Sequence, residues 1–276
     1  MIASTIRVVA QKIRHTPGLR SCTSVWNLMR APYARVLRTL ARGQGISVRL
    51  AGHSLKLDPC FATQNWEATE TECYRAFVAE LHSGSVVYDV GAHLGTYAIL
   101  AAQCSAPSGR VVAYEPMDGS REFLNLHLRL NGAGSRVIVR SFCCGSEPGM
   151  ACLYHDATRA AGDSSLVPLS GSEYTVVKLV TLDSEVNELG LVPSVIKIDV
   201  EGWEWEVLKG ARKTLEQHRP CLFLSLHPPA LMRLGASPHA VLSWLEGFRY
   251  GWQIIARDHE VHVFARWKEE QEGQRR

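Results

Sequence analysis

The sequence predicts an α/β fold: a doubly wound, Rossmann-like parallel sheet with an antiparallel C-terminal strand pair and an N-terminal extension of helices and a hairpin. Two observations lead to this prediction. From residue 84 onward, short apolar runs alternate with helical stretches, which is typical of a sheet wound by right-handed crossovers. The runs also lack a polar–apolar alternation, as expected of strands that are covered on both faces.

These runs place the elements of the sheet domain in order. Strands are expected at residues 85–90, 110–115, 136–142, 194–200 and 221–226, and helices at residues 96–104, 119–130, 203–217 and 240–247. Two further apolar runs flank residues 258–260 and predict an antiparallel strand pair at the end of the chain. Residues 145–175, which are rich in Gly and Ser, are expected to form a loop over the ligand crevice.

The first 57 residues predict helices followed by a hairpin. An apolar stripe with helical spacing consists of Val25, Met29, Val36 and Leu40. Residues 46–57 alternate apolar and polar side chains around Gly52, which predicts a hairpin. Residues 65–81 predict a further helix with acidic side chains near its start, where the helix dipole favours them.

Charge divides the chain into a basic extension, residues 1–57, and an acidic domain, residues 58–276. The extension carries ten basic side chains and no acidic one, whereas the domain carries 20 basic and 27 acidic side chains. This balance argues against an enzyme that binds nucleic acid with a basic face. We expect the extension to contact an anionic membrane surface, an acidic partner or the acidic domain itself.

The cysteines and the N-terminus predict a reducing, cytoplasmic location. The eight cysteines form no Cys-x-x-Cys pair and no regular spacing, so neither a disulfide framework nor a zinc site is expected. Arg7 and Lys12 interrupt the apolar N-terminal run and argue against a secretory signal, whereas an arginine-rich, acid-free start is also compatible with organelle targeting. The chain has no run of 18 apolar residues, so no transmembrane helix is expected.

The residues that carry chemistry begin with a glycine loop after the first buried strand. Gly91 permits a tight turn at the strand end, and Gly95 lets the backbone approach a ligand at the N-terminus of the next helix. The Gly-x-x-x-Gly spacing differs from the Gly-x-Gly-x-x-Gly loop that seats a dinucleotide pyrophosphate. Asp89, at the strand end before the loop, suits a ligand with a cationic end, such as an amino acid.

Glu115 closes the second strand, twenty residues after the last glycine of the loop. An acidic residue at this place in a nucleotide-binding βαβ unit accepts hydrogen bonds from the hydroxyls of a ribose. With the loop, it points to a nucleoside that carries an amino-acid tail, which is S-adenosylmethionine. The expected cofactor-binding residues are Asp89, Gly91, His93, Gly95, Thr96 and Glu115.

Three further titratable residues follow the fourth and fifth strands and are the expected catalytic residues. Asp199 and Glu201 are two positions apart, so on an extended chain both carboxylates point the same way. Such a pair can share a proton, bind a metal or hold polar groups of a substrate. His227 ends the fifth strand at the same edge of the sheet and could take a proton from a hydroxyl near neutral pH.

These segments resemble the FkbM-family methyltransferases. The resemblance extends over residues 66–228 and rests on VVYDVGAHLGTYAILAAQ, GRVVAYEP, TLDS and, above all, IKIDVEGWEWEVLKGA. It implies a class I S-adenosylmethionine-dependent methyltransferase that O-methylates hydroxyls of polyketides, sugars or lipid-linked glycans. By position, Asp89, Gly91 and Gly95 would hold the methionine end of the cofactor and Glu115 its ribose.

The chain departs from the family pattern at several positions. His93 stands where Asn is more frequent, and Ser225 stands where an acidic residue is common. The acceptor proton could pass to His227 or Asp199, or a divalent cation held by Asp199 and Glu201 could lower the pKa of the hydroxyl. We expect no metal, because the carboxylates suffice as hydrogen-bond acceptors.

Other functions stay open as alternatives to O-methylation of a small molecule or glycan. An N-methyltransferase acting on protein or nucleic acid is disfavoured because Asp-Val-Glu-Gly replaces an Asn/Asp-Pro-Pro-aromatic turn after the fourth strand. A nicotinamide-dependent oxidoreductase is disfavoured because the dinucleotide loop is missing. A non-catalytic protein that binds S-adenosylmethionine would share the same fold.

Overall fold

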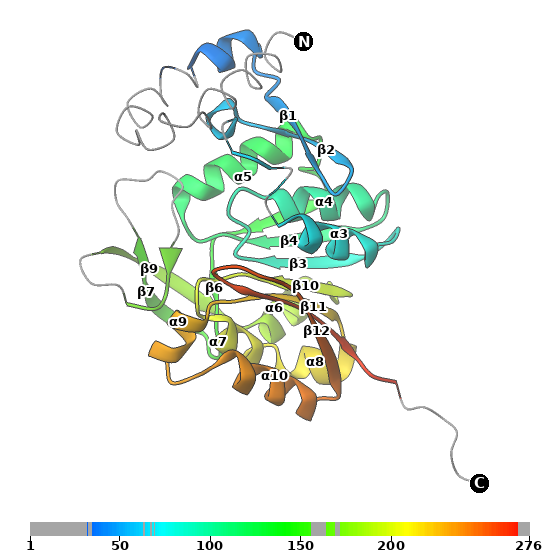
Figure 1. Cartoon of the computed structure of the whole chain (residues 1–276), viewed down its shortest axis with the longest axis vertical. Helices are drawn as coiled ribbons and strands as arrows, with labels where there is room; N and C mark the ends of the chain where they lie inside the picture. The colour runs from blue at the N-terminus through cyan, green and yellow to red at the C-terminus, as the bar shows by residue number, and fades with distance from the viewer. Residues whose placement is uncertain are drawn as a thin grey trace.

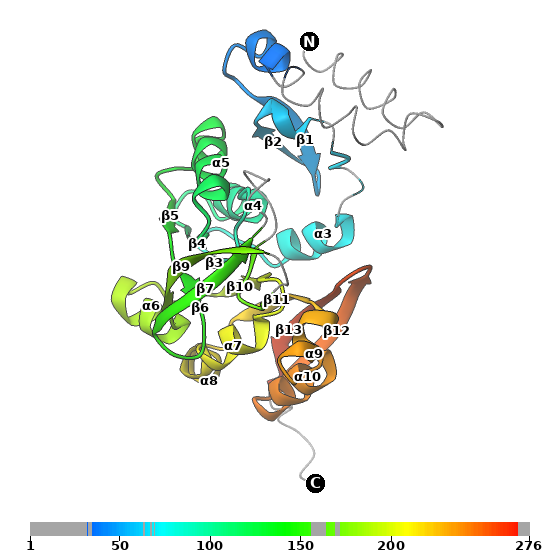
Figure 2. The same cartoon turned by 90° about the vertical axis from the view of Figure 1, so that its left-hand side faces the viewer.

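In the computed structural model, a seven-stranded sheet lies between two layers of helices (Figures 1 and 2). The structure describes residue 32 and residues 35–62, 64–66, 68, 70–155, 164–168 and 172–269. The order across the sheet is β12-β13-β11-β10-β3-β4-β5. These strands are β3 (Val86–Val90), β4 (Arg110–Tyr114), β5 (Val137–Arg140), β10 (Val195–Ile198), β11 (Cys221–Leu226), β12 (Tyr250–Arg257) and β13 (Val261–Trp267).

The strand directions confirm the predicted doubly wound sheet with an antiparallel C-terminal pair. Strands β5, β4, β3, β10 and β11 are parallel, and β13 runs antiparallel between β11 and β12. The chain moves from β3 outward to β4 and β5 and then returns to β10 on the other side of β3. Ligands of open α/β sheets bind at such a reversal, outside the carboxyl ends of the strands.

Neighbouring residues of each strand face two separate hydrophobic cores. Val87 and Val111 pack in the core of one helix layer, whereas Tyr88 and Val112 pack in the core of the other. The first layer consists of α3 (Thr71–Ala79), α4 (Thr96–Cys104) and α5 (Asp118–Leu130), and the second of α6 (Leu182–Leu189), α7 (Glu204–Lys209), α8 (Arg212–His218), α9 (Pro228–Arg233) and α10 (Pro238–Gly247). Burial on both faces explains why the strands are apolar without alternation.

The predicted hairpin is present and lies against the first helix layer (Figure 2). Strands β1 (Ile46–Leu50) and β2 (His53–Leu57) pair in antiparallel register across Ala51 and Gly52, which both have positive φ. Such a two-residue turn matches the twist of a hairpin. Leu55 and Leu57 are fully buried in the core shared with α4 and α5, so the hairpin belongs to the folded core.

The helical stripe predicted before the hairpin is wrong where the structure describes it. Residues 35–40 are helical, but Val36 is 54% and Leu40 39% exposed, whereas Leu37 is fully buried. Arg38 forms an ion pair with Asp58 just after β2 (N–O distance 2.9 Å). This contact is compatible with the orientation of the helix that buries Leu37 in the core. Val25 and Met29 lie outside the described residues.

In the described parts of residues 145–175, residues 149–155, 164–165 and 173–175 belong to strands of a second sheet, where a loop was predicted. Its strands, in the order β6-β9-β7-β8, are β6 (Cys143–Cys144), β7 (Gly149–His155), β8 (Ser164–Ser165) and β9 (Glu173–Val180). Leu153 and Val177 point inward and are buried, while Met150 and Val176 are exposed. One face of this sheet is therefore packed, and the Gly and Ser content of the segment hid that alternation.

Two predicted helices differ in extent from those observed. The helix expected at residues 203–217 is divided into α7 and α8 at Gly210, where a Cβ atom would lie 1.9 Å from the Gly145 carbonyl oxygen. The helix expected from residue 65 begins only at Thr71, because Glu70 has a positive φ of 45°. Helices α6 and α9 and a 3₁₀ turn, η1 (Pro59–Phe61), were not expected.

Two expectations about the whole chain can be compared with the described residues. None of the helices in these ranges is both long and apolar enough to span a membrane. The seven cysteines in the same ranges are all free thiols.

Candidate functional site

A cavity of about 400 Å³ lies at the carboxyl ends of β3, β4 and β10, where the strand order reverses. Five of the predicted site residues line it: Gly91, His93, Glu115, Asp199 and Glu201. The other four, Asp89, Gly95, Thr96 and His227, do not contribute to its wall. The second sheet adds Leu153, Ser164 and Leu166, so the segment expected over the crevice does border it.

The two glycines of the loop are needed for packing of the protein itself. Gly91 has φ of +85°, and a Cβ atom there would lie 1.8 Å from the Asp199 carbonyl oxygen. Gly95 has φ of +82°, and its Cβ would lie 2.3 Å from Leu124 Cδ1. The expected reason for these glycines, close approach of a ligand to the backbone, is thus incomplete. The loop must first fit against β10 and α5.

Glu115 joins the end of β4 to the glycine loop. The His93 backbone N–H donates to Glu115 Oε2 (2.8 Å), and the Met117 N–H donates to Oε1 (2.9 Å). Burial raises the pKa of Glu115 to about 7, against the effect of these two hydrogen bonds. Each oxygen has a further lone pair, so the carboxylate can also accept hydroxyl groups from the cavity.

Asp89 and Thr96 lie beneath the loop and do not line the cavity. Asp89 is 2% exposed, and its Oδ2 atom has no hydrogen-bond partner among the described residues. Burial raises the pKa of Asp89 to about 7, although the charge of Lys197 opposes this shift. Thr96 Oγ1 is hydrogen-bonded to Tyr74 Oη (2.9 Å). Their expected contact with a cofactor stays a prediction.

His227 lies at the centre of a group of carboxylates on the other side of the cavity. His227 Nδ1 is 2.9 Å from Oε1 of the fully buried Glu204. Three carboxylates surround the second ring nitrogen, Nε2: Glu201 at 3.2 Å, Glu260 at 3.4 Å and Asp199 at 3.9 Å. Glu201 reaches this position although its φ is +53°, so the expected extended chain from Asp199 to Glu201 is wrong.

This environment changes the protonation expected for His227. Burial alone lowers the pKa of the imidazole, but the hydrogen bond to Glu204 and the nearby carboxylates of Glu260 and Glu201 outweigh burial and raise it to about 11. With this pKa the ring is protonated at neutral pH. In this state of the site, His227 cannot accept the proton of a hydroxyl, which was one of the two expected routes.

Asp199 is held by a buried lysine that sequence reasoning did not single out. Lys197 Nζ donates to Asp199 Oδ2 (3.1 Å) and to Ser225 Oγ (2.6 Å), and Ser225 Oγ lies 3.1 Å from His262 Nδ1. Burial by itself would raise the pKa of Asp199, but the Lys197 charge holds it below its usual value. Asp199 therefore presents an ionised carboxylate to the cavity.

Three residues of the site were missed: Lys197, Glu204 and Glu260. Glu204 lies in the segment with the strongest family resemblance, IKIDVEGWEWEVLKGA, so its position in that segment was an available signal. Lys197 interrupts an apolar strand and could have been noticed as a buried charge that needs a partner. Glu260 comes from the turn between β12 and β13, and no local pattern brings that turn to the cavity.

The chain matches a family of known proteins over more than half of its length. The family description "Methyltransferase FkbM domain" matches residues 89–251. The hexuronic acid methyltransferase AglP of Haloferax volcanii is 32% identical over 149 residues. These residues are 53% of this chain and 58% of that protein, so the chain spans little more than half the length of this curated relative.

The solved structures that match this chain share little sequence with it. A methyltransferase FkbM from Methylobacillus flagellatus has 18% identity and a TM-score of 0.48, covering 84% of this chain and 60% of that one. An O-methyltransferase from Bacillus cereus, in complex with SAH, has 10% identity and a TM-score of 0.47, covering 73% and 82%.

Proposed function

Because this chain belongs to the FkbM methyltransferase domain family, we propose that it transfers the methyl group of S-adenosylmethionine to a hydroxyl of a small molecule, sugar or lipid-linked glycan. One observation carries the proposal. In the cavity at the strand reversal, Glu115, the carboxylate after β4 that is expected to bind a ribose, shares one wall with the carboxylates of Asp199 and Glu201 after β10. One pocket thus offers a place for a cofactor and a place for an acceptor.

The cofactor would bind on the Glu115 side. The ribose hydroxyls would donate to the free lone pairs of Glu115, and the cavity volume lies within the usual range for pockets that bind small molecules. Gly91 and His93 line this side, and the buried Asp89 lies directly below it as a partner for the methionine end. The cationic sulfonium would face a wall rich in carboxylates, which favours its charge.

The acceptor would bind on the Asp199 side. In the transfer, the methyl–sulfur bond breaks as the methyl–oxygen bond forms, and S-adenosylhomocysteine leaves uncharged. The hydroxyl proton passes to the carboxylate of Asp199, while Glu201 holds the acceptor and His227, behind the cavity wall, orients the carboxylates. Since the methyl group is already activated, alignment of the two reactants supplies much of the rate.

Sugar hydroxyls are the first acceptor class to test, because the matched relative from Haloferax volcanii is named a hexuronic acid methyltransferase. The full chain would be incubated with methyl-labelled S-adenosylmethionine and a panel of hexuronic acids and neutral sugars. Each sugar would be paired with its fully O-methylated analogue as the control. Label on the free sugar and not on the analogue is expected.

Other outcomes of that assay would decide between the alternatives. Label found only on amines of protein or nucleic acid would favour an N-methyltransferase. Binding of the cofactor without transfer to any extract fraction would favour a non-catalytic protein. Transfer that survives both Asp199→Asn and His227→Ala at near wild-type rate would remove the roles given to these residues, since loss of the general base Asp199 alone should lower turnover by about 10²–10⁴-fold.

We also keep the division into a basic extension (1–57) and a methyltransferase domain (58–276) as a proposal, with a cytoplasmic location. The family match at residues 89–251 lies wholly within the second part. In the described part of the extension, Arg38 pairs with Asp58 of the domain, which supports contact between the two. Vesicles with anionic or neutral lipids would test whether the extension also binds a membrane surface.

A further inference from the structure

We propose that Asp199, His227 and Glu260 bind a divalent cation on the acceptor side of the cavity, and that Mn²⁺ fits these ligands best. This departs from the expectation that the carboxylates act without a metal. The proposal rests on the proposed function only for the role of the cation, which would bind neighbouring oxygens of the acceptor. Cation binding itself can be tested without cofactor or acceptor.

The three side chains already offer ligand atoms at a suitable spacing. One atom from each lies within 4.8 Å of the others. Glu260 Oε1 is 3.4 Å and Asp199 Oδ1 3.9 Å from His227 Nε2. For metal–ligand bonds of about 2.1 Å, neighbouring ligands of an octahedral ion are separated by roughly 3.0 Å and opposite ligands by roughly 4.2 Å. Small side-chain adjustments would therefore complete the site.

The state of His227 is a second observation that points to a ligand. The residue is 7% exposed, and no group in the described ranges forms a hydrogen bond with its Nε2 atom. Its Nδ1 atom lies 2.9 Å from Glu204, which is fully buried and also accepts from the Gly202 N–H. A carboxylate on the far nitrogen orients a metal-binding histidine. Binding of the cation would displace the Nε2 proton of His227, leave the proton on Nδ1 and direct Nε2 at the ion.

The carboxylates are oriented toward the same point. Lys197 binds Oδ2 of Asp199, while Oδ1 is the atom nearer to His227. Glu260 Oε2 is buried without a hydrogen-bond partner in the described part of the chain, and Oε1 lies 2.9 Å from the exposed His259 as well as 3.4 Å from His227. Glu201 Oε2, 3.2 Å from His227 Nε2, is close enough to provide a fourth ligand.

The mixture of donors indicates the class of ion. Carboxylate oxygens suit Mg²⁺, Ca²⁺ and Mn²⁺, whereas imidazole nitrogen favours transition metals. Mn²⁺ satisfies both preferences. Asp199 and Glu260 line the cavity, so the remaining coordination positions would face the acceptor, where two adjacent oxygens of a sugar could bind.

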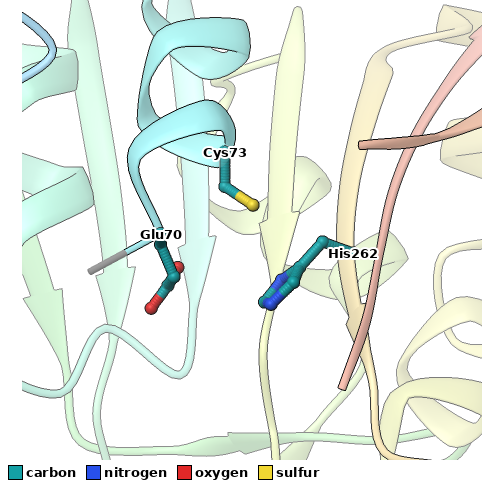
Figure 3. Close-up of side chains that lie close together, drawn as sticks. All are labelled: Glu70, Cys73 and His262. Carbon is teal, nitrogen blue, oxygen red and sulfur yellow. The ribbon is translucent and has the colours of Figure 1, made fainter. Parts of the chain in front are cut away.

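A second group of side chains, Glu70, Cys73 and His262, also lies close together but is less suited to a cation (Figure 3). Lys197 donates to Ser225, so the Ser225 hydroxyl is left to donate to His262 Nδ1 (3.1 Å). The proton of a neutral His262 then resides on Nε2, the nitrogen that would have to bind the ion. Tyr97 Oη already donates to Glu70 Oε2 (2.9 Å). This group supplies the matched control.

Titration of the metal-stripped full chain with MnCl₂, followed by the electron paramagnetic resonance signal of free Mn²⁺, tests the proposal. We expect one site per chain, at least tenfold weaker in Glu260→Gln and in Asp199→Asn, and unchanged in Cys73→Ser. Glu204→Gln should weaken it by about 10–100-fold, through the orientation of His227. Thermal melting of each variant would show that it is folded. If one of the two ligand variants, Glu260→Gln or Asp199→Asn, does not fold, the other still tests the site.

Several results would overturn the cation site. One is that no Mn²⁺ binds up to about 1 mM. Another is that the wild type and both ligand variants bind Mn²⁺ equally well. A third is loss of binding in Cys73→Ser, which would place the ion in the group of Glu70, Cys73 and His262. Calorimetry with S-adenosylmethionine on the same samples keeps the two proposals apart. Bound Mn²⁺ without cofactor binding would contradict the methyltransferase only, and chelator-resistant methyl transfer without bound Mn²⁺ would contradict the cation only.

Discussion

Glu115 shows how one side chain can serve the fold and the chemistry at once. Its two oxygens accept the backbone N–H groups of His93 and Met117, and its side chain is only 5% exposed. From the sequence alone, we would expect a carboxylate in an open crevice whose removal hardly affects folding. The structure contradicts that picture, so a test of its role must keep the shape of the side chain.

Glu115→Gln is therefore the informative change at this position. It keeps the size of the side chain but removes the charge and replaces one acceptor oxygen by a donor. We expect affinity for S-adenosylmethionine to fall by roughly 1.5–3 kcal/mol, or about ten- to a hundredfold, the scale of hydrogen bonds to a charged group. Calorimetry measures the affinity. Glu122→Gln, at an exposed position of α5, is the control because it removes the same charge. Equal affinity in both variants would remove the ribose assignment.

The raised pKa of Glu115 also predicts a pH dependence of stability. The folded carboxyl has a pKa of about 7 and its ordinary value is 4.5, so between these values the folded state binds more protons than the unfolded state. Stability contributed by this group then falls as pH rises through that window. Between about pH 5.5 and 7, the loss is on the order of 2 kcal/mol.

Denaturant unfolding of the ligand-free chain at both pH values checks this sign. The wild type should lose more stability than Glu115→Gln between the two, because the amide does not titrate. Parallel losses in the two proteins would show that burial does not raise the pKa of Glu115.

At the scale of elements, the junction of β3, the glycine loop and β10 controls the geometry of the site. Gly91→Ala would place a Cβ atom 1.8 Å from the Asp199 carbonyl oxygen at a φ of +85°. Gly132→Ala has the same positive-φ strain (+62°) but meets nothing within 4 Å, so it is a matched control. We expect Gly132→Ala to cost about 1 kcal/mol and Gly91→Ala at least about 2 kcal/mol more.

Urea unfolding measures this difference, and cofactor titration of any folded Gly91→Ala protein measures the effect on the site. Since the clash displaces Asp199, turnover should fall even where the cofactor still binds. Equal destabilisation by the two alanines would mean that β3 and β10 can separate freely at this junction.

The segment before the hairpin gives a second test at the same scale. Leu37 is fully buried and Val36 is 54% exposed, although the two are adjacent on one helix. Leu37→Ala should cost about 2–4 kcal/mol, because it leaves a cavity, and Val36→Ala less than about 0.5 kcal/mol. Denaturant unfolding measures the free energy of unfolding of both variants. A larger loss in Val36→Ala than in Leu37→Ala would support the apolar stripe predicted from the sequence.

Local signals predicted most elements, and long-range contacts caused the errors. The bounds of α4 and β11 agree with the prediction because apolar runs and flanking residues define them. The helix at 203–217 was predicted as one piece because only the contact between Gly210 and Gly145 shows why it is divided. Helical spacing does not say which face of residues 35–40 is buried, since that depends on contacts with distant residues, such as the core around Leu37 and the ion pair of Arg38 with Asp58.

At the scale of the whole molecule, the sequence pointed to the strand reversal, where the cavity lies, but not to all of the residues around it. Motifs next to strand ends located Glu115 and Asp199, because parallel strands bring their carboxyl ends to one edge. Glu260 enters from the turn of the last strand pair, and Lys197 and Glu204 act behind the wall. Such contacts depend on packing and cannot be predicted from spacing.

We propose that this cavity binds S-adenosylmethionine and not a dinucleotide. A calorimetric titration of the full chain with S-adenosylmethionine, beside one with NAD under the same conditions, tests this. We expect one molecule of S-adenosylmethionine to bind per chain and NAD to give no heat beyond dilution. Binding of NAD in the absence of S-adenosylmethionine binding would contradict it.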